Sequence, residues 1–114
     1  GITIEQSLVP RFPEVNISDL QDAWRDILKR AKLVQHHKIT REELSVREHM
    51  GMVLRRLQGR CFVPFEELFD PASGSAVLVV TFIALLELGK ETLIDITQAE
   101  AFAPIYVRLA YSPS

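Results

Sequence analysis

The segment of residues 76–88 is apolar on nearly every side, and this restricts the possible folds of the chain more than any other feature. From residue 76 to 86 only Thr81 interrupts the apolar run, which has about half the length that a membrane-spanning helix needs. A helix that is apolar nearly all round is either buried in a core or covered by a partner. The rest of the chain, or another protein, must therefore cover this segment.

An amphipathic helix is predicted at residues 18–35. Apolar residues recur there at helical spacing, and Ser18 is a favoured first residue that precedes acidic side chains. The preceding residues 1–17 contain Pro10 and Pro13 and follow no helical or strand period. We therefore expect an extended arm at 1–17.

A second helix is predicted at residues 46–58. Ser45 and Glu48 have the spacing of a capping box, and Gly59 stands where a helix-ending glycine belongs. The residues between the two helices form a short polar link. We accordingly divide the chain into the arm, the first helix with its link at 18–40, and a domain at 41–111.

The order of elements after residue 45 is that of a winged helix-turn-helix, an α+β fold that is mostly helical. Pro64 suits the start of a short helix, Gly89 suits the end of a longer one, and β-branched residues near the C-terminus indicate two strands. The predicted elements after the helix at 46–58 are a strand at 60–63, helices at 64–69 and 76–88, and a wing hairpin of strands at 92–97 and 104–109.

The helix at 76–88 occupies the position of a DNA-recognition helix, but its composition argues against that role. It contains no Lys, Arg, Asn or Gln, and acidic residues at 66, 67 and 70 precede it. Phosphate contacts supply most DNA affinity, and the net charge of −2 gives no general attraction to nucleic acid. A cluster at Arg25, Lys29, Arg30 and Lys32 remains a candidate for weak DNA contact, or it is an ordinary solvated helix face.

The apolar helix has two sides that sequence alone cannot assign to core or surface. One side contains Val77, Leu78, Ala84, Leu85 and Leu88. The other contains Val79, Phe82, Ile83 and Leu86. Either the wing and the first helix cover both sides, or the second side docks on another protein.

No group of residues has the pattern of a catalytic or metal site. The histidines at 36, 37 and 49 lack further ligands at metal-binding spacing, and Glu66 and Glu67 lie where the dipole of a helix favours acids. The single cysteine, Cys61, fits a reducing, intracellular setting and is more typical of a buried small residue than of a nucleophile. We predict a protein that is not an enzyme and has no cofactor, metal or small-molecule substrate.

Most of the chain resembles a known family. The stretches VVTFIALLEL at 79–88, LIDITQ at 93–98 and FAPIYVR at 102–108, together with SVREH at 45–49 and FEELF at 65–69, resemble the C-terminal winged helix of the bacterial kleisin ScpA, segregation and condensation protein A. The similarity covers roughly residues 18–109.

The resemblance implies a non-enzymatic subunit of the Smc–ScpA–ScpB condensin complex in the cytoplasm, associated with the nucleoid. It implies that the winged helix docks on a β-sheet of the Smc ATPase head, that the arm at 1–17 is the end of a region that binds the ScpB dimer, and that DNA is contacted indirectly. The alternative is a DNA-binding winged-helix regulator. The candidate head-binding residues are Val79, Phe82, Ile83, Leu86, Tyr106 and Arg108.

Overall fold

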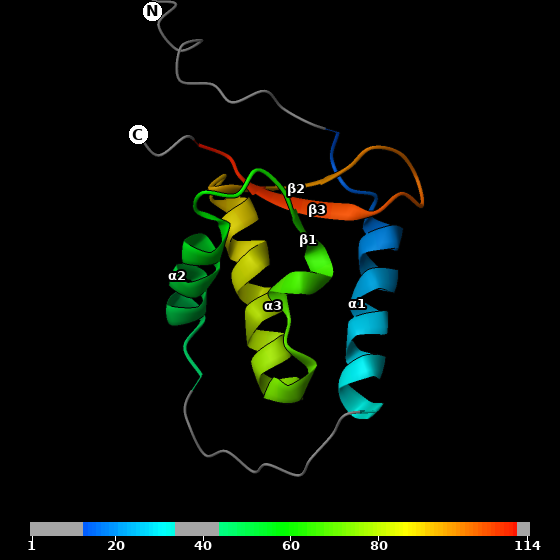
Figure 1. The fold of residues 1–114 in the computed structure, drawn as a ribbon, viewed down its shortest axis with the longest axis vertical. Coiled ribbons are helices and arrows are strands. Elements are labelled where there is room, and N and C mark those ends of the chain that lie inside the picture. The colour runs from blue at the N-terminus through cyan, green and yellow to red at the C-terminus, as the bar shows by residue number, and fades with distance from the viewer. Residues whose placement is uncertain (1–12, 34–43, 112–114) are drawn as a thin grey trace, which may run out of the picture.

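The computed structural model describes residues 13–33 and 44–111. Three long helices stand beside one another, and a small antiparallel sheet crosses one end of them (Figure 1). This arrangement confirms the predicted α+β winged helix, with the hairpin of the last two strands as the wing. The elements are α1 (Ile17–Leu33), α2 (Val46–Leu57), β1 (Val63–Pro64), the 3-10 helices η2 (Phe65–Leu68) and η3 (Pro71–Ser73), α3 (Ser75–Lys90), β2 (Ile94–Gln98) and β3 (Ile105–Leu109).

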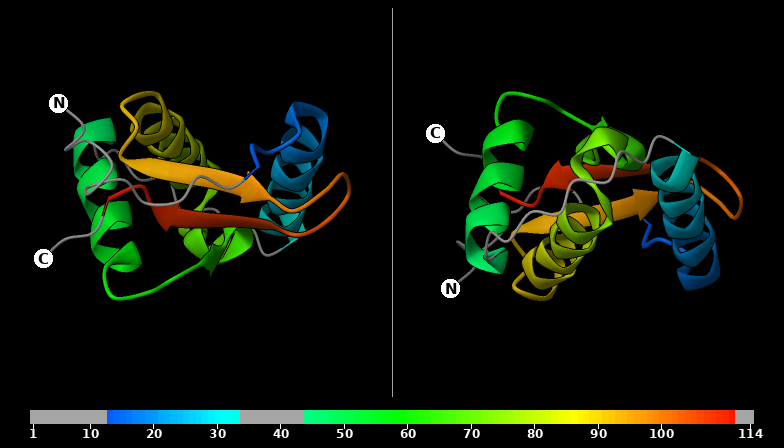
Figure 2. Two further views of the ribbon diagram at one scale, coloured as in Figure 1. Left: turned by 90° about the horizontal axis from the view of Figure 1, so that it is seen from above. Right: turned by 90° about the horizontal axis from the view of Figure 1, so that it is seen from below.

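The sheet has the strand order β1-β3-β2, so the last strand lies in the middle. In the wing, Ile96 lies opposite Val107 and Thr97 lies opposite Tyr106. Because side chains alternate between the two faces of a strand, Val107 points into the core and Tyr106 points outward. Seen from above, the hairpin lies across the helices and its loop reaches the start of α1 (Figure 2).

The hydrophobic core surrounds α3, which lies between α2 and α1 (Figure 1). Leu78, Leu85 and Leu88 of α3 are almost fully buried, and burial of each such side chain stabilises the fold by about 1.5–3 kcal/mol. The first helix belongs to the same core, because its residues Leu20, Ile27 and Ala31 are buried in the same cluster. These residues cover the side of α3 that faces them.

The predicted start of α2 is confirmed, and the helix ends one residue earlier than predicted, at Leu57. The Ser45 Oγ accepts a hydrogen bond of 3.2 Å from the Glu48 N–H, which satisfies one free donor of the first turn. After the helix, Gly59 adopts a φ of 76°, a left-handed conformation that glycine adopts without steric cost. The chain can therefore turn directly toward β1.

The first helix begins one residue earlier than predicted. Its cap is Asn16 rather than Ser18, because the Asn16 Oδ1 accepts a hydrogen bond of 3.2 Å from the Asp19 N–H. Asn and Ser cap helices about equally well, so the sequence did not distinguish the two. The predicted last residues 34 and 35 lie outside the described residues, as do the link at 36–40 and arm residues 1–12.

The apolar helix does not end at Gly89 as predicted; α3 continues to Lys90. Thr92 takes the left-handed position with a φ of 59°. Its N–H donates to the Gly89 carbonyl at 3.0 Å, and the Leu93 N–H donates to the Leu88 carbonyl at 2.9 Å. This pair of bonds forms a Schellman motif, which ends the helix although a threonine stands at the usual glycine position.

The connection between α2 and α3 is less regular than predicted. The strand expected at 60–63 is β1 at 63–64, and the helix expected at 64–69 is the single 3-10 turn η2. A second 3-10 turn, η3, follows Asp70, whose Oδ1 accepts a hydrogen bond of 3.0 Å from the Ala72 N–H. The wing strands also begin one or two residues later than predicted.

The end of the predicted arm lies along the free edge of the wing. Glu14 forms an isolated antiparallel bridge with Thr97 of β2. The Pro13 carbonyl accepts hydrogen bonds from the Thr97 hydroxyl at 2.8 Å and from the Gln98 N–H at 3.3 Å. Residues 13–16 therefore cover the β2 edge before α1 begins.

Candidate functional site

One face of α3 presents an apolar stripe to solvent. Val79, Ile83 and Leu86 follow one another at helical spacing and are 43%, 43% and 45% exposed. On a helix, residues four and three positions apart lie on the same face. We call these three residues the α3 stripe; they belong to the predicted second side of the helix.

Phe82, the fourth residue predicted on that side, lies differently. Its ring stacks on Trp24 of α1 with the ring centroids 4.4 Å apart, and it meets the ring of Phe65 edge-on at 6.2 Å. Phe82 is half-buried in this aromatic cluster. The structure thus separates Phe82 from the α3 stripe, although both were predicted on one surface.

The two wing residues predicted to face outward also differ in exposure. Tyr106 and Arg108 alternate with the buried Ile105, Val107 and Leu109, so both belong to the outer face of β3. Tyr106 is exposed, whereas Arg108 is only 9% exposed. The guanidinium of Arg108 lies 5.7 Å from the centre of the Phe62 ring, and its Nε lies 3.9 Å from the Asp95 carboxylate across the hairpin.

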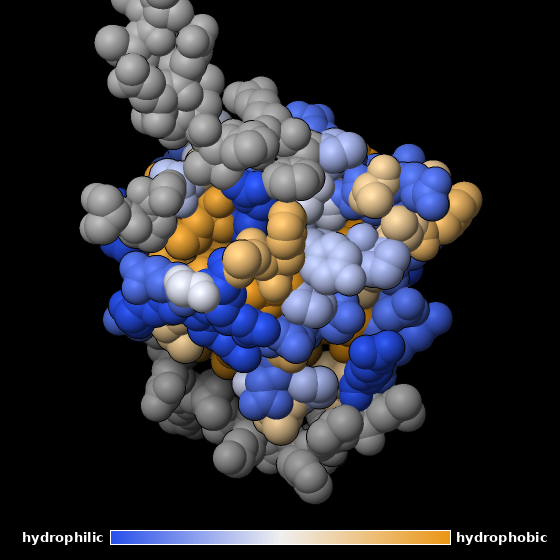
Figure 3. Space-filling view, turned by 45° about the horizontal axis from the view of Figure 1, so that its top comes forward, coloured by the Kyte–Doolittle hydropathy of each residue, from blue (hydrophilic) through white to orange (hydrophobic). Residues whose placement is uncertain are grey.

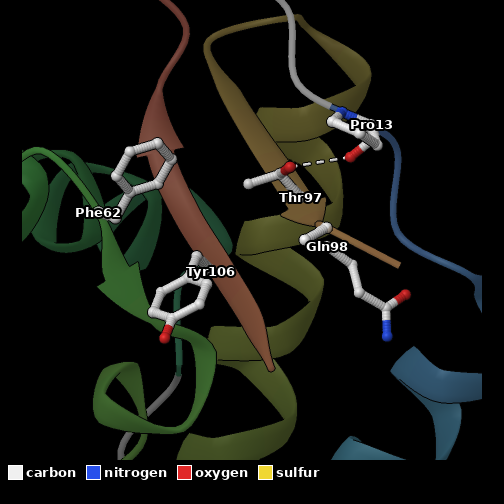
Figure 4. Close-up of a pocket in the computed structure, with 6 residues that line it drawn as sticks. Pro13, Phe62, Thr97, Gln98 and Tyr106 are labelled. Atoms are coloured by element: carbon white, nitrogen blue, oxygen red, sulfur yellow. Dashed lines mark hydrogen bonds between the residues drawn. The ribbon is translucent and has the colours of Figure 1, made fainter. Parts of the chain in front are cut away.

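An apolar pocket of about 400 Å³ lies on the outer face of the sheet (Figure 4). The Phe62 and Tyr106 rings form one side of it, and meet edge to face with centroids 6.2 Å apart. Pro13, Thr97 and Gln98 form the opposite side. The space-filling view shows apolar surface in separate areas with hydrophilic side chains between them (Figure 3).

Sequence reasoning missed Phe62 and Phe102 as surface aromatics. Phe62 precedes the buried Val63, so strand alternation places it on the outer face, and this was the available signal. Phe102, at the tip of the wing loop, is 89% exposed and has a φ of 64°. Its N–H donates a hydrogen bond of 2.7 Å to the Asp19 Oδ2, which also accepts from the Gln98 side chain at 2.9 Å.

The candidate DNA-binding residues all lie on the exposed surface of α1. They are Arg25, Lys29, Arg30 and Lys32. Acidic side chains are interspersed among them, and Arg25 forms a 3.1 Å ion pair with Asp22. No base-reading side chain joins them from α3, whose one basic residue is Lys90.

The residues considered as metal ligands or as a nucleophile do not gather at one site among the described residues. His49 lies on α2, where its Nδ1 is 2.9 Å from the Ser45 carbonyl oxygen, and His36 and His37 lie outside the described residues. Cys61 is exposed, so its predicted burial is wrong. Within residues 13–33 and 44–111, no three potential metal ligands gather and no helix is long and apolar enough to cross a membrane.

Glu66 and Glu67, the acidic pair before the apolar helix, contact different parts of the protein. Glu67 forms a 3.1 Å ion pair with Arg60, on the loop after α2. Glu66 lies on the other side of η2, beside residues of α1 such as Ala23 and Asp26. The two carboxylates therefore do not converge on a common site.

The sequence as a whole is similar to one protein family. The model of the family described as segregation and condensation protein ScpA matches residues 3–110. A segregation and condensation protein A from Xylella fastidiosa strain Temecula1 is 46% identical over 104 residues, which is 91% of this chain and 34% of the relative.

Two further relatives with the same name show similar values. The protein from Coxiella burnetii is 41% identical over 84% of this chain and 36% of its own length. The protein from Listeria monocytogenes serotype 4a is 41% identical over 83% of this chain and 39% of its own length. The chain thus spans somewhat more than a third of these curated relatives.

Proposed function

The chain belongs to the segregation and condensation protein A family, and on this premise we propose that it is the winged-helix part of a bacterial kleisin. Its role is non-enzymatic. The winged helix docks on the ATPase head of an Smc protein and thereby helps to close the complex around chromosomal DNA. This role places the protein in the cytoplasm, associated with the nucleoid.

The observation that carries the proposal is the α3 stripe. Three large aliphatic side chains at one face of a helix are only half covered by the protein itself. Exposed apolar patches on soluble proteins often mark interaction surfaces, and such a patch on the helix that would otherwise read DNA favours a protein partner. We propose that Val79, Ile83 and Leu86 contact the head directly, and that Phe82 supports them from the Trp24 side.

The wing extends the proposed surface. Tyr106 is exposed on the outer face of β3, and aromatic residues are enriched among those that dominate binding energy. Arg108 is largely buried beside Phe62 and Asp95. We therefore assign direct contact in the wing to Tyr106 and a positioning role to Arg108.

A calorimetric titration of this chain with the purified Smc head, in the presence of ATP, tests the proposal. We expect micromolar or tighter binding that Leu86→Arg or Ile83→Arg abolishes. Ile17→Arg is the control, because Ile17 is an aliphatic residue on α1 that is even more exposed than the α3 stripe. Loss of binding in the control alone, or full binding by both stripe variants, would contradict the proposal.

DNA is the second candidate ligand, and the basic residues of α1 are the place to look for it. Duplex DNA titrated in parallel distinguishes the two functions. Direct DNA binding would weaken steeply with added salt and with neutralisation of Lys29, Arg30 and Lys32. We expect no such binding by the isolated chain, because Asp22 and Asp26 lie among these cations.

The proposal also assigns a partner, the ScpB dimer, to the arm. Residues 1–17 form the end of the region that binds a ScpB dimer. Residues 13–16 rest against β2, so the arm leaves the domain beside the wing. A pull-down of ScpB by the chain, lost when residues 1–12 are removed, tests this assignment.

A further inference from the structure

We propose that a groove between α1 and the wing loop binds a lysine- or arginine-bearing segment of a protein partner. The groove has a volume of about 290 Å³ and lies where the loop after β2 reaches the start of α1 (Figure 2). None of the residues that line it belongs to the α3 stripe. The proposal therefore concerns a second surface and does not rest on the Smc head.

Apolar side chains from two elements line the groove. Ala23 contributes from α1, and Ala103, Pro104 and Ile105 contribute from the wing. Phe102 also lines the groove, and its side chain is 89% exposed. Because aromatic residues are enriched among those that dominate binding between proteins, this exposed ring favours a protein partner. A side chain that enters the groove covers apolar surface on both sides.

The same groove carries a set of carboxylates. Asp19, Asp22 and Asp26 follow one another on α1 at spacings of three and four positions, which places them on one face of the helix. Glu66 of η2 adds a fourth carboxylate to the lining. No lysine, arginine or histidine lines the groove among the residues that the structure describes. The groove therefore has a local negative charge that its own walls do not balance.

Two of these carboxylates remain available to a ligand. Asp26 and Glu66 are exposed and form no ion pair within residues 13–33 and 44–111. Arg30 lines an adjoining smaller pocket together with both but pairs with neither. Asp22, in contrast, already pairs with Arg25 at 3.1 Å.

The fourth carboxylate fixes the shape of the groove. The Asp19 Oδ2 accepts a hydrogen bond of 2.7 Å from the Phe102 N–H and one of 2.9 Å from the Gln98 side-chain amide. These bonds join the wing loop to α1. Asp19 thereby positions the apolar wall opposite the acidic face of the helix.

A lysine or arginine side chain matches both kinds of wall. Its aliphatic stem packs on apolar surface while its charged end stays with polar groups, here the carboxylates of Asp26 and Glu66. A cation above a phenyl ring gains further electrostatic attraction, which Phe102 can supply. Nucleic acid is disfavoured at this groove, because its phosphates repel carboxylates.

The test is a titration of the isotope-labelled chain, followed by amide NMR signals. The probe is an acetylated and amidated tripeptide of arginine, leucine and arginine. We expect saturable shifts at Phe102, Ala103 and Ala23, and we expect added sodium chloride to weaken the binding because salt screens exposed charges. The absence of any shift at these amides would overturn the proposal.

Charge-neutral variants test the assigned carboxylates. Asp26→Asn combined with Glu66→Gln should weaken peptide binding about fivefold, because each exposed ion pair contributes only modestly. Glu67→Gln is the matched control, since Glu67 is the adjacent exposed acid but pairs with Arg60 outside the groove. Unchanged affinity in the double variant, or an equal loss in the control, would contradict the proposal.

Three further additions identify other occupants. A peptide with citrulline in place of arginine has the same shape without the charge, and binding of equal affinity would show that the groove selects apolar surface alone. Shifts at the same amides with calcium chloride but not with the peptide would identify a metal-ion site. Shifts that appear when the chain alone is concentrated would identify a second copy as the occupant. Each of these results would overturn the proposal.

Discussion

The indole ring of Trp24 lies nearly parallel to the phenyl ring of Phe82, with 4.4 Å between the ring centroids and 12° between the planes. Trp24 belongs to α1 and Phe82 to α3, so this stack joins the first helix to the centre of the winged helix. The side of α3 that contains Phe82 is therefore covered by the chain itself. The large apolar residues of α3 that stay exposed are those of the α3 stripe, Val79, Ile83 and Leu86.

Removal of the stack should destabilise the whole domain. Trp24 contacts both Phe69 and Phe82, and loss of a packed aromatic ring costs about 3 kcal/mol. We expect Trp24→Ala to lower the free energy of unfolding by this amount in urea denaturation. Ile17→Ala, an exposed position on the same helix, should change it by less than about 0.5 kcal/mol. Equal effects of the two variants would show that α1 is not part of the core.

Phe82 and Leu86 should respond differently to the same charged substitution. Phe82→Arg inserts a cation among aromatic rings and should cost roughly 3 kcal/mol or more of stability. Leu86→Arg alters a half-exposed position and should stay within about 0.5 kcal/mol of the parent chain. Circular dichroism during thermal unfolding measures both. A folded Phe82→Arg chain as stable as the parent would show that Phe82 is not part of the core and lies at the surface.

Glycine-to-alanine changes distinguish the ends of α2 and α3. Gly89 lies inside α3, and a Cβ there meets no atom within 4 Å, so Gly89→Ala should stabilise the protein by about 0.5 kcal/mol. Gly59 has a left-handed φ of 76°, so Gly59→Ala should destabilise it by about 1 kcal/mol. If Gly89→Ala is as harmful as Gly59→Ala, α3 ends at Gly89 after all.

The wing should depend on Asp19 for its attachment to α1. The Asp19 carboxylate accepts hydrogen bonds from the Phe102 N–H and the Gln98 side-chain amide. Each hydrogen bond to a charged group contributes roughly 1.5 kcal/mol, and we expect Asp19→Ala to cost at least one of them. Asp22→Ala is the control, because its exposed ion pair with Arg25 contributes less than about 1 kcal/mol. Amide hydrogen exchange of the wing loop should quicken only in Asp19→Ala.

Features of α2 that depend on local residues alone could be predicted from the sequence. The cap at Ser45 and the turn at Gly59 follow from local sequence and were predicted correctly. The end of α3 was not, because Thr92 adopts a conformation that β-branched residues rarely take. That conformation depends on the hydrogen bonds that close the turn, which local propensity does not report.

The assignment of the sides of α3 required the three-dimensional structure. A helix that is apolar nearly all round has no preferred face, so spacing grouped Phe82 with Val79, Ile83 and Leu86. The neighbour that separates them, Trp24, lies 58 residues away in the sequence. Likewise, the outer pocket combines Pro13 with Phe62 and Tyr106, a combination that only the sheet register and the entry of the arm produce.

A methyl NMR titration of this chain with the Smc head tests directly whether the α3 stripe contacts the head. We expect the methyl signals of Val79, Ile83 and Leu86 to shift or broaden on addition of the head, while those of the buried Leu78 and the exposed Ile17 change little. Unchanged stripe methyls, with perturbations confined to α1 around Lys29, would contradict it.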